Sequence, residues 1–102
     1  TINGVHIEGI TNAINVILII NSGDDEVSEM MKKDYKILSS DPNYEVLMYA
    51  KSDGERVTTL LNATKSEKEV VMYIDEKDEL TFIVLTGTFT DEQLKKLLDG
   101  NK

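Results

Sequence analysis

The sequence of 102 residues contains no cysteine, no tryptophan and a single histidine, His6. The absence of cysteine excludes disulfides, thiolate metal ligands and a cysteine nucleophile. One histidine alone gives little basis for a Ser-His-Asp triad, which needs a base held between two partners. The commonest catalytic and soft-metal chemistries are therefore not expected.

Long apolar runs are also missing. An aliphatic run such as Val16–Ile20 has the length of a strand, whereas a transmembrane helix needs about 20 apolar residues. We therefore expect no membrane-spanning helix. The chain begins at Thr1 without a basic segment or a cleavage site, so we expect an upstream signal or anchor segment to have been removed.

Positive charge is scarce. The chain has 11 Lys and Arg and 19 Asp and Glu, which gives a net charge of -8. The charges are spread without an acidic tail or a basic arm. A surface of this sign repels phosphate backbones, so nucleic acid is not an expected partner. It also disfavours direct binding to anionic lipid. The length suits one domain over residues 1–102, with residues 1–11 as a lead-in segment.

The first half of the chain predicts a strand, a helix and a second strand. Residues 13–20 are rich in β-branched side chains, which is typical of a strand. Apolar positions three and four residues apart predict a helix over 24–38, with Ser22 or Asp24 as its N-cap. A loop around the single proline should end the helix. Residues 44–51 form the second predicted strand.

The second half predicts three more strands and a second helix. The pair Asp53-Gly54 is a strong hairpin signal. The three further strands are expected over residues 56–63, 69–75 and 80–88. Thr90 and Gln93 have the spacing of a capping box, which starts the last helix, and Gly100 ends it.

The order strand, helix, four strands, helix predicts an α+β fold. Four consecutive strands joined by short turns favour an antiparallel meander, so the whole sheet should have about five strands. We expect both helices to pack on one face of this sheet.

The strands carry more apolar side chains than one covered face needs. An exposed face of an antiparallel sheet is normally polar, yet the second face would still carry nine sizeable side chains. These candidate interface residues are Ile17, Ile19, Leu47, Tyr49, Leu60, Val71, Tyr73, Ile83 and Leu85. A patch of this kind indicates an interface or a ligand groove.

Three occupants of this spare face are open. Residues 1–11, together with a missing upstream segment, could fold over it. A second copy of the chain or a partner protein could cover it, which is the reading we favour. A small apolar ligand could also lie between the sheet and the helices.

Candidate metal-binding groups are few. The acidic hairpin of Asp75, Glu76, Asp78 and Glu79 could bind calcium, but it lacks the spacing and the central glycine of a calcium loop. A solvated hairpin tip is therefore expected. The acids at 24–26 are explained by the positive end of a helix dipole.

The remaining candidate groups have structural explanations. His6 has no carboxylate at helical spacing, which favours a surface or packing role over that of a base. Core or interface packing is expected for the tyrosines and methionines, which are Tyr35, Tyr44, Tyr49, Tyr73, Met30, Met31, Met48 and Met72. We predict no catalytic residue, no cofactor and no metal site.

The C-terminal two thirds resembles a family of small envelope proteins of Bacteroidetes, catalogued as domain of unknown function 4252. The stretches that carry the resemblance are Leu47-Met48, Asp53-Gly54-Glu55, Glu69-Val70-Val71-Met72 and Leu85-Thr86-Gly87-Thr88-Phe89-Thr90. Residues 12–38 fit the order of elements in the family. The resemblance implies export to the periplasm, the outer membrane or the cell surface, with an upstream signal and often a lipidated cysteine. The family is uncharacterised, so it supplies no site residues.

Gly87 within this stretch has a physical interpretation. A glycine late in a strand permits a bulge or a close backbone approach, so Gly87→Val should destabilise the fold. Taken together, we expect a non-enzymatic envelope module, a lipoprotein domain, that self-associates or binds a partner through an apolar sheet face. The alternative is a carrier for a small apolar ligand, and an enzyme ranks third because no positioned acid, base or nucleophile is visible.

Overall fold

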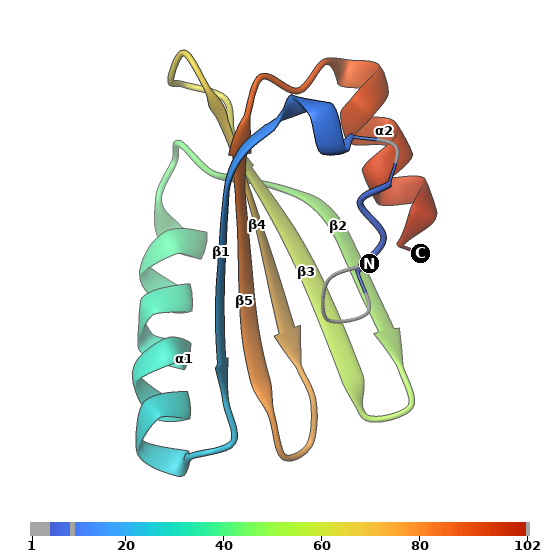
Figure 1. The fold of residues 1–102 in the computed structure, drawn as a ribbon. Coiled ribbons are helices and arrows are strands. Elements are labelled where there is room, and N and C mark those ends of the chain that lie inside the picture. Colours follow the sequence, from blue (N-terminus) through green and yellow to red (C-terminus); the bar gives the residue numbers. More distant parts are fainter. Residues whose placement is uncertain (1–4, 9, 102) are drawn as a thin grey trace.

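The computed structural model describes residues 5–8 and 10–101. Its centre is a five-stranded antiparallel sheet in the order β1-β5-β4-β3-β2 (Figure 1). The strands are β1 (Ile14–Ser22), β2 (Glu45–Ser52), β3 (Glu55–Asn62), β4 (Lys68–Asp75) and β5 (Leu80–Gly87). Strands β2 to β5 form the expected meander, whereas β1 pairs with β5. The α+β class and the order of elements are confirmed, and β1 and β2 are the two edges of the sheet.

Two capped helices complete the fold. Helix α1 (Asp25–Ser40) begins where the Asp24 side chain accepts a hydrogen bond from the Val27 N–H at 3.1 Å, so of the two expected caps it is Asp24 that acts. The helix ends two residues later than expected, immediately before the residue that precedes the proline. Helix α2 (Asp91–Gly100) has the complete capping box, with Thr90 and Gln93 bonded reciprocally.

The two helices lie on opposite faces of the sheet (Figure 1), so the expectation that both cover one face is wrong. We call the two sides the α1 face and the α2 face. The physical reason is visible in β4, where Val70, Met72 and Ile74 point to the α2 face and Val71 and Tyr73 to the α1 face. All five are buried, and a strand that is apolar on both sides needs a covering layer on each.

Each face has its own core. On the α1 face, Met31 of α1 packs with Leu60, Tyr73 and Phe82, and Tyr35 stacks on Tyr73 with ring centroids 4.0 Å apart. The α2 face buries side chains from the sheet, from α2 and from the lead-in segment, among them Ile10, Val70, Met72, Ile83, Leu85, Phe89, Leu94 and Leu97. The described part of the lead-in therefore does fold over a sheet face, beside α2.

Gly87 marks the closest backbone approach on the α2 face. The short 3-10 turn Thr11–Ala13 crosses the end of β5, where the Thr88 N–H donates to the Ala13 carbonyl at 3.1 Å. A Cβ atom on Gly87 would lie 2.0 Å from that carbonyl oxygen and 3.1 Å from the Phe89 ring. No side chain fits there unless the backbone moves, so glycine is required by space.

We predict that Gly87→Ala lowers the free energy of unfolding by about 2–3 kcal/mol, the usual cost of overpacking a close contact. Urea denaturation followed by circular dichroism measures this change. Gly23→Ala is the matched control, because its Cβ would meet only the Asp78 carbonyl oxygen at 3.4 Å. Equal effects of the two substitutions would contradict the steric explanation.

Candidate functional site

Strand β1 carries the most unusual surface of the described structure. Its five consecutive apolar residues are all exposed, at 56% for Val16, 41% for Ile17, 50% for Leu18, 40% for Ile19 and 42% for Ile20. Val16, Leu18 and Ile20 lie opposite Thr86, Val84 and Phe82 of β5, and the two residues between them lie opposite Leu85 and Ile83. Opposed residues share a face, so β1 exposes apolar side chains on both faces at once.

The exposure of β1 follows from how the two layers are placed. On the α1 face, Met31, Tyr35 and Leu38 of α1 pack toward Leu60 and Tyr73, which belong to the inner strands β3 and β4. On the α2 face, α2 and the lead-in segment gather over the core of β3, β4 and β5. Both layers therefore cover mainly the centre of the sheet. They leave Val16–Ile20 of β1 exposed, whereas Leu47 of β2 is partly buried against the α2-face core.

The other edge, β2, has the features that normally prevent strand addition. It carries the charged residues Glu45 and Lys51, and its pairing with β3 is broken by a register shift between Val46 and Met48. Charged side chains and bulges are the usual protection of an edge strand. Strand β1 has no charged residue, and its register shift lies at its start, between Ile14 and Val16.

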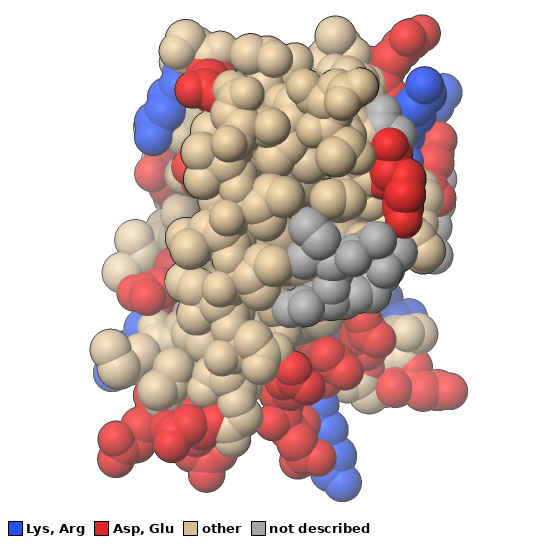
Figure 2. Space-filling model, in the orientation of Figure 1, with Lys and Arg blue, Asp and Glu red and all other residues tan. Residues whose placement is uncertain are grey.

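The surface over β1 is uncharged as well. Figure 2 shows a continuous area without Lys, Arg, Asp or Glu along the length of β1, with charged side chains gathered around it and below it. The apolar run lies between two polar residues, Asn15 and Asn21. The Asn15 side chain donates a hydrogen bond to Glu67, and the Asn21 side chain donates one to Glu79. We call residues 15–21 the β1 surface.

The nine candidate interface residues do not share one face. Five of them are buried in the two cores, namely Leu60, Val71, Tyr73, Ile83 and Leu85, and Leu47 is partly buried against the α2-face core. Three are exposed: Ile17 and Ile19 belong to the β1 surface, and Tyr49 lies on β2 at the far edge. Val16, Leu18 and Ile20 alternate with Ile17 and Ile19 along β1, so the prediction of a single spare face did not include them.

A groove runs beside α1 on the α1 face. It measures about 460 Å³ and is lined by side chains of α1 and of β2, β3 and β4, namely Lys32, Tyr35, Lys36, Tyr49, Arg56, Thr58, Tyr73 and Asp75. The Arg56 guanidinium lies 3.0 Å from the Asp75 carboxylate. Burial raises the pKa of the Tyr73 hydroxyl, and the negative charge of Asp75 adds to this shift.

A second cleft lies between α2 and β2 and measures about 430 Å³. Its apolar lining comes from Leu47, Met48, Leu61, Leu94 and Leu98, with Glu45, Asp91, Lys95 and Asp99 around it. Because five of its lining side chains are apolar, this cleft offers space to a small apolar ligand.

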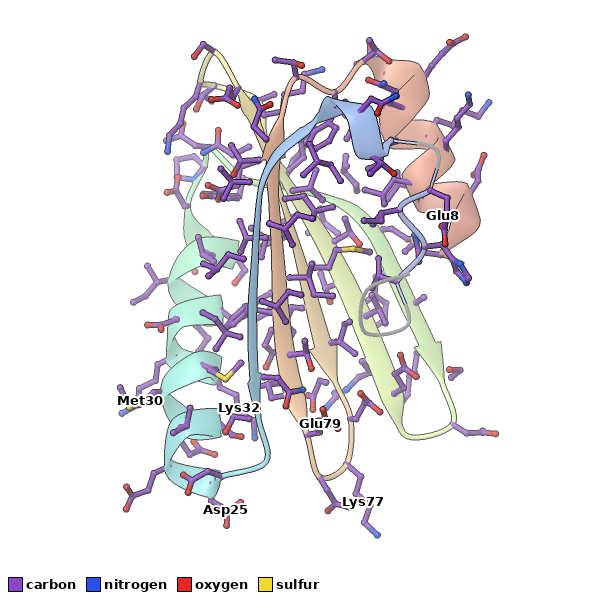
Figure 3. The ribbon with its side chains drawn as sticks, viewed as in Figure 1. Glu8, Asp25, Met30, Lys32, Lys77 and Glu79 are labelled. Carbon is purple, nitrogen blue, oxygen red and sulfur yellow. The ribbon has the colours of Figure 1, made fainter. Side chains whose placement is uncertain are left out.

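The two acidic segments meet at one end of the molecule. Asp25 at the start of α1 and Lys77 and Glu79 in the β4–β5 hairpin lie at this end (Figure 3), around a polar recess of about 180 Å³. Burial raises the pKa of Glu76, with smaller effects of the Glu55 and Glu79 carboxylates. Within the described residues, no group of three or more His, Asp or Glu side chains has the geometry to hold a metal ion.

His6 lies on the lead-in segment rather than near either acidic cluster. Its backbone N–H donates to the Asn101 side chain at 2.7 Å, and its ring nitrogen Nδ1 lies 3.8 Å from Glu8. The methionines divide between core and surface: Met31 and Met72 are buried, whereas Met30 is 65% exposed and points away from the sheet (Figure 3).

The comparison with known families adds one finding. A family model described as a domain of unknown function, number 4252, matches residues 2–97. The chain belongs to this family. The membership of this family that the sequence predicted is thereby confirmed. No curated protein and no solved structure matches this family member significantly. Neither helix in the described part of the domain has the length and apolar character that crossing a bilayer requires.

We predict that Tyr73→Phe reduces the loss of stability at high pH. Because the pKa of Tyr73 is raised in the folded state, its hydroxyl ionises first in the unfolded chain, near pH 10 or so. Its contribution to stability is therefore complete below about pH 10 and is lost as the pH rises through the higher pKa of the folded state.

The measurement is urea denaturation at several pH values on both sides of the tyrosine range. The free energy of unfolding of the wild type should fall relative to that of Tyr73→Phe as the pH increases. Tyr49→Phe, which removes a hydroxyl at an exposed position on β2, is the matched control. The same pH dependence in both variants would count against the assignment to Tyr73.

Proposed function

We propose that this domain is a non-enzymatic interaction module that works by accepting an extended strand along β1. The observation that carries this proposal is the run of five exposed apolar residues on an uncharged edge strand. The outer edge of such a strand presents unpaired backbone N–H and C=O groups, which can pair with an added strand. Side chains on both faces would then be buried by the incoming strand.

The asymmetry between the two edges supports this proposal. A domain that had to avoid strand addition would protect both edges, as β2 is protected by Glu45, Lys51 and its bulge. Leaving five aliphatic side chains in water at β1 forgoes burial energy of roughly 25 cal/mol for each Å². A bound strand would recover this energy and would satisfy the free backbone groups.

The non-enzymatic part of the proposal is supported by where the polar groups lie. His6 is on the lead-in segment and the acidic hairpin is at the β4–β5 end. Catalysis by a general acid or base needs such groups within hydrogen-bond reach of one substrate atom. The groove beside α1 contains an Arg56–Asp75 ion pair, which holds both charges in mutual contact.

A second candidate function is a carrier for a small apolar ligand. The cleft between α2 and β2 favours it, because its volume of about 430 Å³ falls within the range of small-molecule sites and five apolar side chains line it. A bound ligand would shield Leu94 and Leu98 from water and would leave β1 exposed. Native mass spectrometry would reveal it as a reproducible extra mass.

We also propose that the domain works in the envelope of a Gram-negative bacterium, either in the periplasm or attached to the outer membrane. The support is the family resemblance drawn from the sequence. Fractionation of cells that express the full-length chain tests this location.

We predict that a neutral probe strand binds β1 and that Val16→Lys weakens this binding about tenfold or more, a loss of about 1.4 kcal/mol. The probe is a nine-residue peptide of alternating valine and threonine. Titration followed by amide NMR shifts should show the largest changes in β1. A lysine on an edge strand opposes pairing because its charge would have to be buried against the added strand.

The control is Val46→Lys, which places the same substitution on the other edge. Val46 is 60% exposed on β2 and Val16 is 56% exposed on β1. The two substitutions therefore lie on different edges of the sheet but at positions of similar exposure. Val46→Lys should bind the probe as the wild type does. Shifts that map to β2 or to the α2 cleft would refute strand addition at β1.

A further inference from the structure

We propose that the strand received by β1 is β1 of a second copy of this chain, paired antiparallel around a two-fold axis through Leu18. This inference rests on the proposed function and names the partner of the same surface. It is carried by the sequence of the exposed run. Residues 15–21 read Asn-Val-Ile-Leu-Ile-Ile-Asn, which is the same in both directions except that Val16 exchanges with Ile20.

A two-fold axis uses this symmetry directly. In an antiparallel pair centred on Leu18, Leu18 faces Leu18 of the second copy, Ile17 faces Ile19, Val16 faces Ile20 and Asn15 faces Asn21. Every apolar residue of the run then meets an apolar residue, and each framing amide meets an amide. Directly opposed side chains in antiparallel strands have Cβ atoms about 5 Å apart, so all of these pairs would be in contact.

Other registers lose this match. An axis through Ile17 would place Ile19 opposite Asn15, and an axis through Ile19 would place Ile17 opposite Asn21. A shift of the pairing by a single residue would turn the side chains of one copy to the wrong face. The composition of the run therefore selects one register among those that a two-fold axis allows.

The symmetry also decides how the two faces continue. Two neighbouring antiparallel strands related by a two-fold have the axis perpendicular to the sheet, so the α1 face of one copy continues into the α1 face of the other. The result is a ten-stranded sheet, because each copy contributes five strands. Val16, Leu18 and Ile20 of both copies would form one apolar strip on the α1 face, and Ile17 and Ile19 would form another on the α2 face.

A closed dimer also accounts for the difference between the edges. Pairing of β1 with β2 of another copy would be head to tail, and such contacts grow into open filaments unless the rotation closes a ring. The charges and the bulge of β2 oppose that contact. Pairing of β1 with β1 consumes the unprotected edge of both copies, so the assembly stops at two.

Because of the charges around the β1 surface, the proposed dimerisation should depend on salt concentration. Asn15 and Asn21 are each bonded to a glutamate, Glu67 and Glu79, so the two-fold brings Glu67 of one copy toward Glu79 of the other. Each copy also has a net charge of -8. Since salt screens repulsion between like charges, dimerisation should strengthen as salt is added. A partner with basic flanks would instead bind more weakly.

The test uses the fact that the chain contains no cysteine. Five single variants place a cysteine at each position from 16 to 20, and a sixth, Tyr49→Cys, places one at an exposed site on β2. Each protein is oxidised under mild conditions, and the disulfide-linked dimer is measured by mass spectrometry over time. Leu18→Cys should form the dimer roughly tenfold faster than the other five, because the axis raises the effective concentration of its thiol alone.

Two further measurements accompany the scan. An equal mixture of Ile17→Cys and Ile19→Cys should form the mixed dimer faster than either forms its own dimer. Wild-type protein should give a dimer by native mass spectrometry and by light scattering at increasing salt, and Val16→Lys should be a folded monomer by circular dichroism and light scattering. Val46→Lys is the control and should remain a dimer.

The outcomes separate this inference from the proposed function. Fastest crosslinking at a position other than Leu18, or equal rates in all six variants, would overturn the two-fold register. A wild type that stays monomeric at high concentration would overturn the second copy as partner. If the valine-threonine peptide still binds β1 in that case, the proposed function stands with a different partner. If the peptide fails to bind as well, the proposed function fails with it.

Discussion

Every strand of the sheet has to satisfy its backbone hydrogen bonds, and this requirement shapes the other features of the fold. Within the described sheet, each inner strand has a neighbouring strand on both sides, whereas β1 and β2 each have one neighbouring strand. Two covering layers, α1 on one face and α2 with the lead-in segment on the other, bury mainly the centre of the sheet and leave Val16–Ile20 of β1 exposed. A five-stranded sheet of this kind must therefore deal with two rows of free backbone groups.

The chain treats these two rows differently. Strand β2 combines charge with a bulge, which keeps its edge in water. Strand β1 has neither within residues 16–20, and its exposed side chains are aliphatic on both faces. No requirement of the fold explains this difference, because β1 pairs with β5 through its other side. A function at the outer edge of β1 does explain it, and the near-palindrome around Leu18 fits a two-fold partner.

Local sequence signals determined much of the fold. Alternation and β-branched side chains located all five strands to within about two residues, and the hairpin at Asp53-Gly54 is a two-residue turn with Gly54 at a φ of 76°. The capping box of Thr90 and Gln93 forms as its spacing predicted, and Asp24 is the one of the two candidate N-caps that acts in α1. These features depend on residues within four positions of one another, so they can be predicted from the local sequence. The close approach at Gly87 could also be anticipated, although its partner, Ala13, could not.

Tertiary structure alone decided which side chains lie together. Alternation divides each strand into two sets, but it does not say which set of one strand shares a face with which set of the next. The nine predicted interface residues were therefore divided between both faces, since Leu60, Val71 and Tyr73 lie on the α1 face and Ile83 and Leu85 on the α2 face. The pairing of β1 with β5 joins residues that are 58 (Ser22 and Leu80) to 73 (Ile14 and Gly87) positions apart, and only that long-range contact makes Val16–Ile20 an edge. Local signals along the chain specify the elements and their order, whereas packing on both faces of the sheet selects the side chains that stay exposed.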